Sequence, residues 1–419
     1  MMFDSVRSNP EKKAKPSTGR GTTSAVTYAI GALTMSVTLA VALGACAGSE
    51  PIHDKADLAH LDVGNYQAEP IELGNARNEK QAFIRESQRL ADFVLLPFEI
   101  DPAYVQHDPA RGMKSNVVEN SKALSDLVIN DTFDDLTDNL VAGWMNSWTT
   151  AGDVSEPRRT LHVAVMMFSD AETASRVGPA LEYDDFTYNI ENESVAIPRY
   201  PNTKAHWRPG ISSIGSWTSH GRYVIFLKYV DGIAEPDLTP LVTQTERALD
   251  AQIPLLEQFD PTPPESRTTV PLDPDRILAR TLPRGAAGFS SLVTPSGAYR
   301  GRGAFHTLTL HTLEFLDSAQ IQAIGVGDSL VFRAGTEDQA RELWNKWKPS
   351  VEESGPGRVT DPPQIGGNVE CYTYLTDAGE PAGSHCVVQA GQYVAQVSSP
   401  HIQDLHQKAA AQYALLVSE

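Results

Sequence analysis

Apolar positions between residues 71 and 259 follow two periods, one typical of strands and one typical of helices. The run TLHVAVMMF over 160–168 and the run GRYVIFLKYV over 221–230 predict strands, because short apolar runs rich in β-branched residues suit a buried sheet. Apolar residues at helical spacing, with Trp144 and Trp148 in one such stretch, predict helices. The predicted helices span 76–91, 131–148, 170–181 and 238–259. This mixture predicts an α+β domain.

The residues after 284 repeat this order. SLVFRA over 329–334 predicts a strand, and a helix ending near Lys348, a hairpin, a strand over 391–399 and a helix over 401–417 follow it. The segments FSDAE and GTEDQ align at a predicted helix start, and GRYV and GQYV align at a predicted strand start. We therefore expect two similar β-α-β-β-α domains, each an antiparallel sheet with helices packed on one face. The alternative is a chance resemblance between two common α+β patterns.

A proline-rich segment is expected to separate the two domains. Residues 260–275, DPTPPESRTTVPLDPD, cannot continue a helix or a central strand, because proline lacks a backbone N–H group. We expect this segment at the surface, with few contacts across it. The predicted organisation is a signal peptide over 1–45, a flexible tether over 46–70, an N-terminal domain over 71–259, a linker over 260–284 and a C-terminal domain with a hairpin over 285–419.

The first residues of the chain have the layout of an export signal. A basic segment of twenty residues leads into the run 21–49, which has no charged side chain. The sequence LGAC at the end of this run resembles a bacterial lipobox. The resemblance implies that Cys46 carries a lipid, that the chain is cut before it, and that the lipid holds the protein on the extracytoplasmic side of the cell membrane. An uncleaved signal anchor with an unmodified Cys46 is the alternative.

The charge of the chain excludes one class of partner. The sequence has 53 acidic and 34 basic residues, which gives a formal net charge of −19. Such a surface repels phosphates, and this argues against binding of nucleic acid and against a lipid-binding face other than the anchor itself.

Two cysteines remain if Cys46 is lipidated. Cys371 and Cys386 flank the turn-rich segment DAGEPAG, and a hairpin centred on this segment places them directly opposite each other. Facing residues of an antiparallel pair lie at a distance that a disulfide spans. We predict a structural disulfide, since the alternatives, a redox-active pair or two metal ligands, lack a CxxC spacing and neighbouring ligands.

Several segments resemble one family in their order along the chain. The lipobox, LDVGNYQAEP, NLVAGW and PLDPDRILARTLP are together similar to actinobacterial, mycobacterial-type exported lipoproteins that are defined by a domain of unknown function. The resemblance implies the location and a two-domain architecture, and no activity. The β-α-β-β-α units also resemble the extracellular sensor-like domains of mycobacterial envelope proteins, a likeness of fold that does not define function.

Motifs for catalysis and for metal binding are missing. The sequence contains no G-x-S-x-G elbow, no S-x-x-K and no H-E-x-x-H. His306 and His311 lie five residues apart, so on one strand they face opposite sides and cannot bind one metal ion. We predict no catalytic residue, no metal ligand and no cofactor.

One segment has the composition of a recognition surface. Residues 200–217, YPNTKAHWRPGISSIGSW, combine aromatic and basic side chains in an expected loop, and such side chains on loops often bind ligands or partners. The candidate recognition residues are Tyr200, His206, Trp207, Arg208 and Trp217. The alternative is that Trp207 or Trp217 fills the core of its own domain.

These observations favour a lipid-anchored envelope protein that binds an unidentified ligand or protein partner without catalysis. An enzyme that cleaves envelope polymers through paired carboxylates is the first alternative, because such a pair needs no short motif. A structural spacer is the second. Two buried carboxyl groups facing a cleft favour the enzyme, whereas a shallow or apolar groove favours binding.

Overall fold

A computed structural model describes residues 58–108, 116–152, 156–284, 296–306, 320–349 and 357–418. The lipobox and Cys46 lie outside the described residues.

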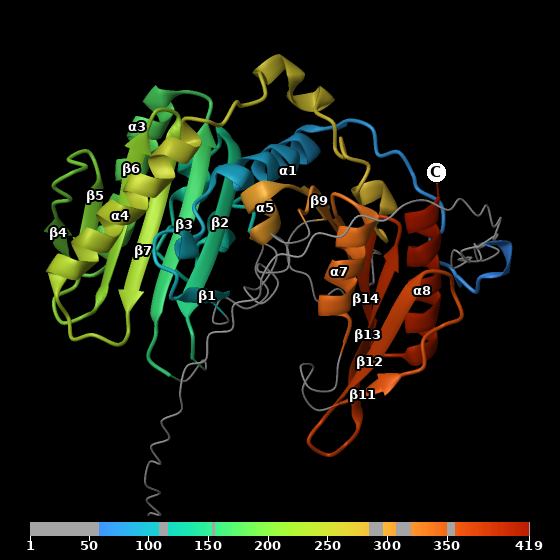
Figure 1. Ribbon diagram of the computed structural model, residues 1–419. Coiled ribbons are helices and arrows are strands. Elements are labelled where there is room, and N and C mark those ends of the chain that lie inside the picture. Colours follow the sequence, from blue (N-terminus) through green and yellow to red (C-terminus); the bar gives the residue numbers. More distant parts are fainter. Residues whose placement is uncertain are drawn as a thin grey trace, which may run out of the picture. The chain divides into compact units, whose positions relative to one another are not determined.

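The N-terminal domain is built on a seven-stranded antiparallel sheet with the order β1-β2-β3-β7-β6-β5-β4 (Figure 1). Its strands are β1 (Tyr104–His107), β2 (Leu140–Thr150), β3 (Arg159–Phe168), β4 (Glu193–Val195), β5 (Lys204–Trp207), β6 (Ser213–His220) and β7 (Tyr223–Asp231). Its helices are α1 (Glu79–Leu90), α2 (Phe133–Leu136), α3 (Ala171–Tyr188) and α4 (Leu238–Leu256).

The C-terminal domain has a second seven-stranded antiparallel sheet, with the order β11-β12-β13-β14-β10-β9-β8. Its strands are β8 (Gly297–Tyr299), β9 (Ala323–Val326), β10 (Ser329–Arg333), β11 (Gly357–Thr360), β12 (Asn368–Leu375), β13 (Pro381–Ala390) and β14 (Tyr393–Ser399). Its helices are α5 (Gly301–Phe305), α7 (Glu337–Trp347) and α8 (Ile402–Val417). Numbered from the first strand of each, the two sheets have the same strand order. The prediction of two similar α+β domains is therefore confirmed.

The two sheets also match in a local detail of their last hairpin. In the N-terminal sheet the Phe168 N–H donates to Arg222 O at 2.8 Å, and in the C-terminal sheet the Ala334 N–H donates to Gln392 O at 2.9 Å. The residue that begins the turn is a glycine with a positive φ in both sheets, +53° for Gly221 and +51° in the second sheet. The alignment of GRYV with GQYV thus corresponds to equivalent positions in space.

The helix starts align with a shift of one residue from the predicted pairing. The N-cap of α3 is Asp170, whose side chain accepts from Thr173 N, and the N-cap of α7 is Thr336, whose side chain accepts from Gln339 N. The predicted pairing placed Ser169 at the first cap.

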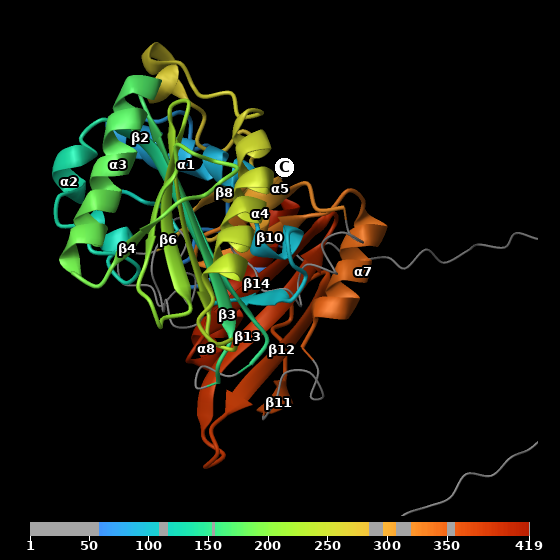
Figure 2. The ribbon, with the colours of Figure 1, turned by 90° about the vertical axis from the view of Figure 1, so that its left-hand side faces the viewer.

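The expectation that helices cover only one face of each sheet is wrong. Alternate residues of β3 point to opposite faces: Val163 and Val165 pack in one cluster with α4, whereas Ala164 and Met166 pack in another with α3. Figure 2 shows α3 and α4 on opposite sides of the sheet. In the C-terminal domain, likewise, α7 and α8 pack in two different clusters. Both sheets are therefore buried on both faces.

The helix predicted over 131–148 is also wrong. Only Phe133–Leu136 are helical, and Leu140–Thr150 form β2. Trp144 and Trp148 are four residues apart, which suits one face of a helix and equally one face of a strand. Every residue of β2 after Leu140 is buried, so the alternation that marks a strand is missing from the sequence.

The predicted linker is tied to the N-terminal domain by backbone hydrogen bonds. The Ala76 N–H donates to Val270 O at 2.9 Å, and the Leu272 N–H donates to Gly74 O at 3.0 Å. Further along the chain, Ile277 is fully buried in the core of the C-terminal domain.

One hydrophobic cluster contains residues of both domains. Trp144 of β2 and Tyr299 of β8 belong to it, with ring centroids 5.8 Å apart. Arg85 of α1 donates from Nη1 to Ala298 O at 2.8 Å. His306 joins the domains as well, because its ring nitrogens contact Asn146 Nδ2 at 3.0 Å and Ala91 O at 2.9 Å.

The last part of the expected tether contacts the C-terminal domain. Leu61, Val63 and Tyr66 pack against the core beside α8. The Tyr66 hydroxyl donates to Asp404 Oδ1 on α8 at 2.5 Å. Residues 61–66 therefore pack on the C-terminal domain.

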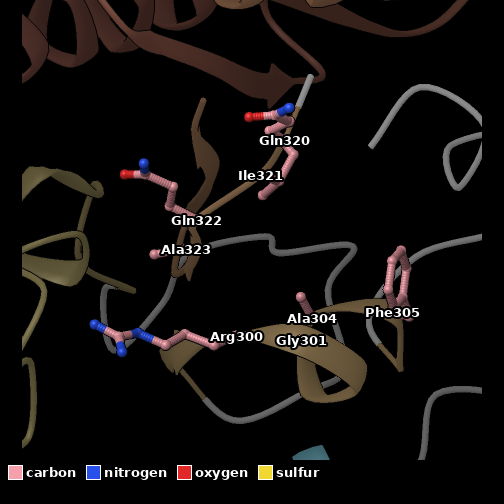
Figure 3. A pocket seen from close by; sticks show the side chains of 8 residues that line it. All are labelled: Arg300, Gly301, Ala304, Phe305, Gln320, Ile321, Gln322 and Ala323. Carbon is pink, nitrogen blue, oxygen red and sulfur yellow. The ribbon is translucent and has the colours of Figure 1, made fainter. Parts of the chain in front are cut away.

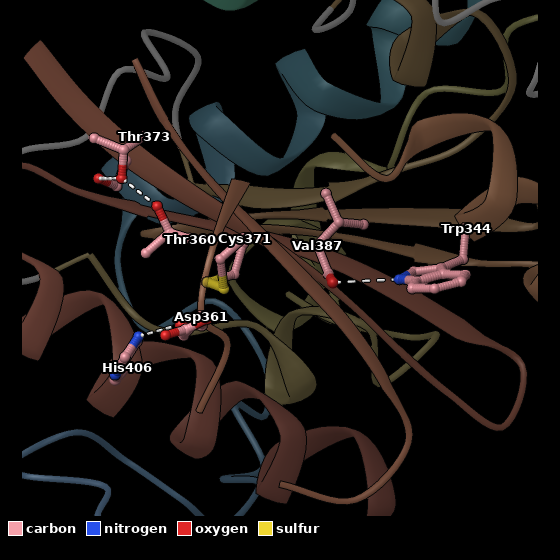
Figure 4. Close-up of a disulfide and its surroundings, with 9 residues drawn as sticks. Trp344, Thr360, Asp361, Cys371, Thr373, Val387 and His406 are labelled. Carbon is pink, nitrogen blue, oxygen red and sulfur yellow. Dashed lines mark hydrogen bonds between the residues drawn. A yellow bond between two sulfur atoms is a disulfide. The ribbon is translucent and has the colours of Figure 1, made fainter. Parts of the chain in front are cut away.

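The structure contains the predicted disulfide. Cys371 of β12 and Cys386 of β13 are directly paired across the hairpin, with a Cα–Cα distance of 4.1 Å. Both are fully buried in the cluster that α8 covers. Figure 4 shows the bond on the side of the sheet where His406 of α8 lies.

Candidate functional site

The structure places the five candidate recognition residues in different surroundings. Trp217 is only 1 % exposed and packs on Phe226, with ring centroids 4.5 Å apart, so it belongs to the core. Tyr200 is held by a hydrogen bond of 2.6 Å from its hydroxyl to Asp250 Oδ1 on α4. A pocket is lined by the other three, which are His206 and Trp207 of β5 and Arg208 just after it.

This pocket, of about 280 Å³, lies at the C-terminal end of α3 and over strands β5, β6 and β7. Besides the three residues above, it is lined by side chains from α3, from β7, from the turns at one end of the sheet and from the segment before α2. They include Leu127, Asp185, Tyr188, Asn192, Ile211 and Lys228. We call it the α3 pocket.

A glycine gives the α3 pocket its depth. His206, Gly215 and Lys228 are direct neighbours on three adjacent strands, so they share one face of the sheet. A Cβ atom added at Gly215 meets nothing closer than His206 Nε2, at 4.0 Å. The missing side chain leaves space between a histidine on one side and a lysine on the other.

His206 links two carboxylates of α3. Its Nδ1 lies 2.9 Å from Glu182 Oε1, and its Nε2 lies 3.1 Å from Asp185 Oδ2. Burial by itself lowers the pKa of His206, but hydrogen bonds and charge from Asp185 and Glu182 outweigh it and raise the pKa to about 9. The imidazole is therefore a cation at neutral pH, and it fixes the end of α3 to β5.

Lys228 lies on the other side of the glycine. Its ammonium group donates to Leu127 O, which is its one hydrogen-bond acceptor among the described residues. Burial lowers the pKa of Lys228, while the charge of Asp185 raises it. An ammonium group has three donors, so further donors remain for a bound molecule.

The same row of residues continues away from the α3 pocket. His162 pairs with Lys228 across β3 and β7, and Ser147 pairs with His162 across β2 and β3. Ser147 Oγ hydrogen-bonds to His162 Nδ1. The two residues are only 6 % and 5 % exposed, so this serine–histidine pair is closed to a substrate in the structure.

Two of the side chains that line the α3 pocket are apolar and exposed. The exposed fractions are 72 % for Tyr188 and 40 % for Ile211. Tyr188 is the last residue of α3, and Ile211 lies in the β5–β6 turn.

A second pocket, of about 220 Å³, lies in the C-terminal domain between α5 and β9 (Figure 3). Its charged residue is Arg300, which already pairs with the buried Asp275. Residues 307–319, which separate Phe305 from Gln320 in the chain, lie outside the described residues. We therefore assign no role to this pocket.

The buried carboxylates bear on the alternative of an enzyme. Glu182 is buried and Asp185 is partly buried beside a pocket, but both are bound by His206. Asp185 also accepts from Ile129 N at 2.7 Å. Neither group is free in the way that a glycosidase acid and its partner must be. Among the described residues, no cluster of three or more His, Cys, Asp or Glu side chains could hold a metal ion.

The sequence missed Lys228, Asp185 and Glu182. The two carboxylates fall in LEYDDF, which is acidic enough to suggest a solvated helix surface. Lys228 is the charged residue inside the apolar strand GRYVIFLKYV, and that position was a usable signal.

The fold and this site define a two-domain α+β protein with duplicated sheet topology and a pocket in the first domain. Family comparison agrees with the division of the chain. The model described as "Domain of unknown function (DUF7373) N-terminal" matches residues 73–272, and its C-terminal counterpart matches residues 277–419. The chain belongs to the DUF7373 family.

Other comparisons add little. No curated protein matches the sequence. The extracellular domain of PknH from Mycobacterium tuberculosis is similar over 41 % of this chain and 97 % of that domain, with 11 % identity and a TM-score of 0.28. A similarity at this level supports no argument about function. The described part of the chain has no helix with the length and hydropathy needed to cross a membrane.

Proposed function

We propose that this protein is a lipid-anchored binding protein of the extracytoplasmic side, and that the α3 pocket holds its ligand. The observation that carries the proposal is the pocket itself. It is concave, it is lined by aromatic, apolar and charged side chains, and its lysine has a single acceptor among the described residues.

Two features support the location. The lipobox resemblance at Cys46 implies a lipid anchor. The disulfide between Cys371 and Cys386 is typical of proteins that fold in an oxidising compartment.

Residues 58–66 suggest how the anchored protein is oriented. The first of them to pack on this domain is Leu61, so the chain between the lipid and that contact is about fifteen residues long and reaches roughly 50 Å at most when extended. The C-terminal domain is then the part tied near the membrane, and the α3 pocket belongs to the domain without the tether.

Native mass spectrometry of protein extracted from its own membrane tests the binding role. We expect wild type to carry a bound small molecule, and we expect Gly215→Val to lose it because valine fills the centre of the pocket. Gly215→Ala is the milder variant and should retain part of the ligand. Equal ligand occupancy in wild type and in a folded Gly215→Val protein would contradict the proposal.

A further inference from the structure

We infer that the ligand of the α3 pocket is an amphipathic anion, with its anionic group at Lys228 and its apolar part on the rim. This inference rests on the proposed binding function and names the chemical class of the ligand. It follows from two independent features of the site, the charges at its floor and the exposed side chains around its mouth.

The charges at the floor favour an anion. Asp185 is the one acidic residue among those that line the pocket, and His206 and the Ile129 N–H already engage it. Lys228 has a single carbonyl acceptor among the described residues. A carboxylate or phosphate oxygen placed over Gly215 comes within reach of this ammonium group and forms a charge-assisted hydrogen bond.

Arg208 adds a second cation near the mouth. Its Nη1 lies 3.9 Å from Glu191 Oε2, and the two side chains are 43 % and 70 % exposed. An exposed pair at this distance contributes little, so the guanidinium can turn to a ligand at small cost.

The rim favours an apolar portion in the same ligand. Tyr188 and Ile211 line the pocket from two separate segments and are 72 % and 40 % exposed, so two large apolar side chains meet water at one opening. Because these side chains gain only when water is removed from them, a hydrocarbon chain or ring that leaves the pocket is the part that covers them.

Calorimetric titration of the soluble protein, beginning at residue 58, with defined probes tests this inference. The probes are decyl phosphate, decanoate, inorganic phosphate and decyl maltoside, each below its micelle concentration. We expect decyl phosphate or decanoate to bind at least tenfold more tightly than the other two, since one lacks the chain and the other lacks the charge. Comparison of decyl phosphate with decanoate tells whether the preferred head group is a phosphate or a carboxylate.

Two charge variants form a matched pair. Lys228→Met should weaken binding of the anionic amphiphile at least tenfold, whereas Lys204→Met removes an exposed lysine of β5 and should leave it unchanged. Ile211→Ser should weaken binding of decyl phosphate and leave binding of inorganic phosphate unchanged. Thermal unfolding of each variant shows that it is folded.

The possible failures are distinguishable. Equal affinity of wild type and Lys228→Met for decyl phosphate overturns the anionic contact, and equal affinity for decyl phosphate and inorganic phosphate overturns the apolar one. In either case the binding function stands if the Gly215→Val protein no longer carries the native ligand. If Gly215→Val changes neither the probes nor the native ligand, the proposed function fails together with the inference.

Discussion

The bridge formed by His206 makes a sharp prediction about stability. Replacing His206 with glutamine removes the imidazolium and leaves the buried Glu182 and the partly buried Asp185 without a cation between them. Breaking a buried ion pair by removing one partner typically costs about 3–5 kcal/mol. We expect His206→Gln to lower the free energy of unfolding of the N-terminal domain by an amount in this range at pH 6.

The loss should depend on pH in a defined direction. The pKa of His206 is raised from 6.5 to about 9 in the folded protein. This difference corresponds to roughly 3 kcal/mol, because a tenfold change in proton affinity is worth about 1.4 kcal/mol. The contribution is fully present below pH 6.5 and is lost as the pH rises through 9. Wild type and His206→Gln should therefore converge between pH 7 and pH 10.

Urea unfolding followed by tryptophan fluorescence at pH 6, 8 and 10 measures this effect. His220→Gln is the matched control, since His220 is 35 % exposed and contacts the single exposed carboxylate of Glu257 at 3.5 Å. The control should follow wild type at every pH. A His206→Gln protein that keeps a constant difference from wild type over the whole range would refute the charged bridge.

Three further predictions concern other parts of the chain. Replacing Cys371 and Cys386 with serine should lower the free energy of unfolding by about 3 kcal/mol, given a loop of 15 residues. The replacement should also abolish the effect of reductant on the urea midpoint. A wild-type protein whose midpoint is insensitive to reductant would contradict the disulfide. Metabolic labelling with a fatty-acid analogue should mark wild type and not Cys46→Ala, and equal labelling would rule out the lipid at that cysteine. Burial lowers the pKa of His306 to about 3, so the stabilising contribution of its neutral form is present above pH 6.5 and is lost as the pH falls toward 3. His306→Phe should lack this part of the acid dependence of stability. An unchanged acid transition would argue against the buried neutral histidine.

Most of the fold is predictable from the sequence, because its signals are local and most of them occur in both domains. The structure has the features that these signals predict. They are the capped helices, the strands that follow Gly221 and the equivalent glycine, and the disulfide expected from the cysteine spacing. The failure at β2 has a physical cause, since a strand buried on both faces loses its alternation. Helices on both faces of each sheet were a missed inference, because a continuous apolar run such as β3 leaves no polar face for solvent.

The site was only partly predictable. His206 and Arg208 were identified from composition, but as members of a loop, whereas His206 lies within a strand. Its partners Glu182 and Asp185 meet it only after α3 has folded back over β5, and no spacing in the sequence encodes that contact. Lys228 becomes part of the site through the register of β6 and β7.

A crystal structure of the protein purified from its native membrane would locate the bound molecule. We expect continuous density in the α3 pocket, with an acidic group within hydrogen-bond distance of Lys228 Nζ and an apolar part beside Tyr188 or Ile211. An α3 pocket that contains only water, with a bound molecule elsewhere on the protein, would contradict it.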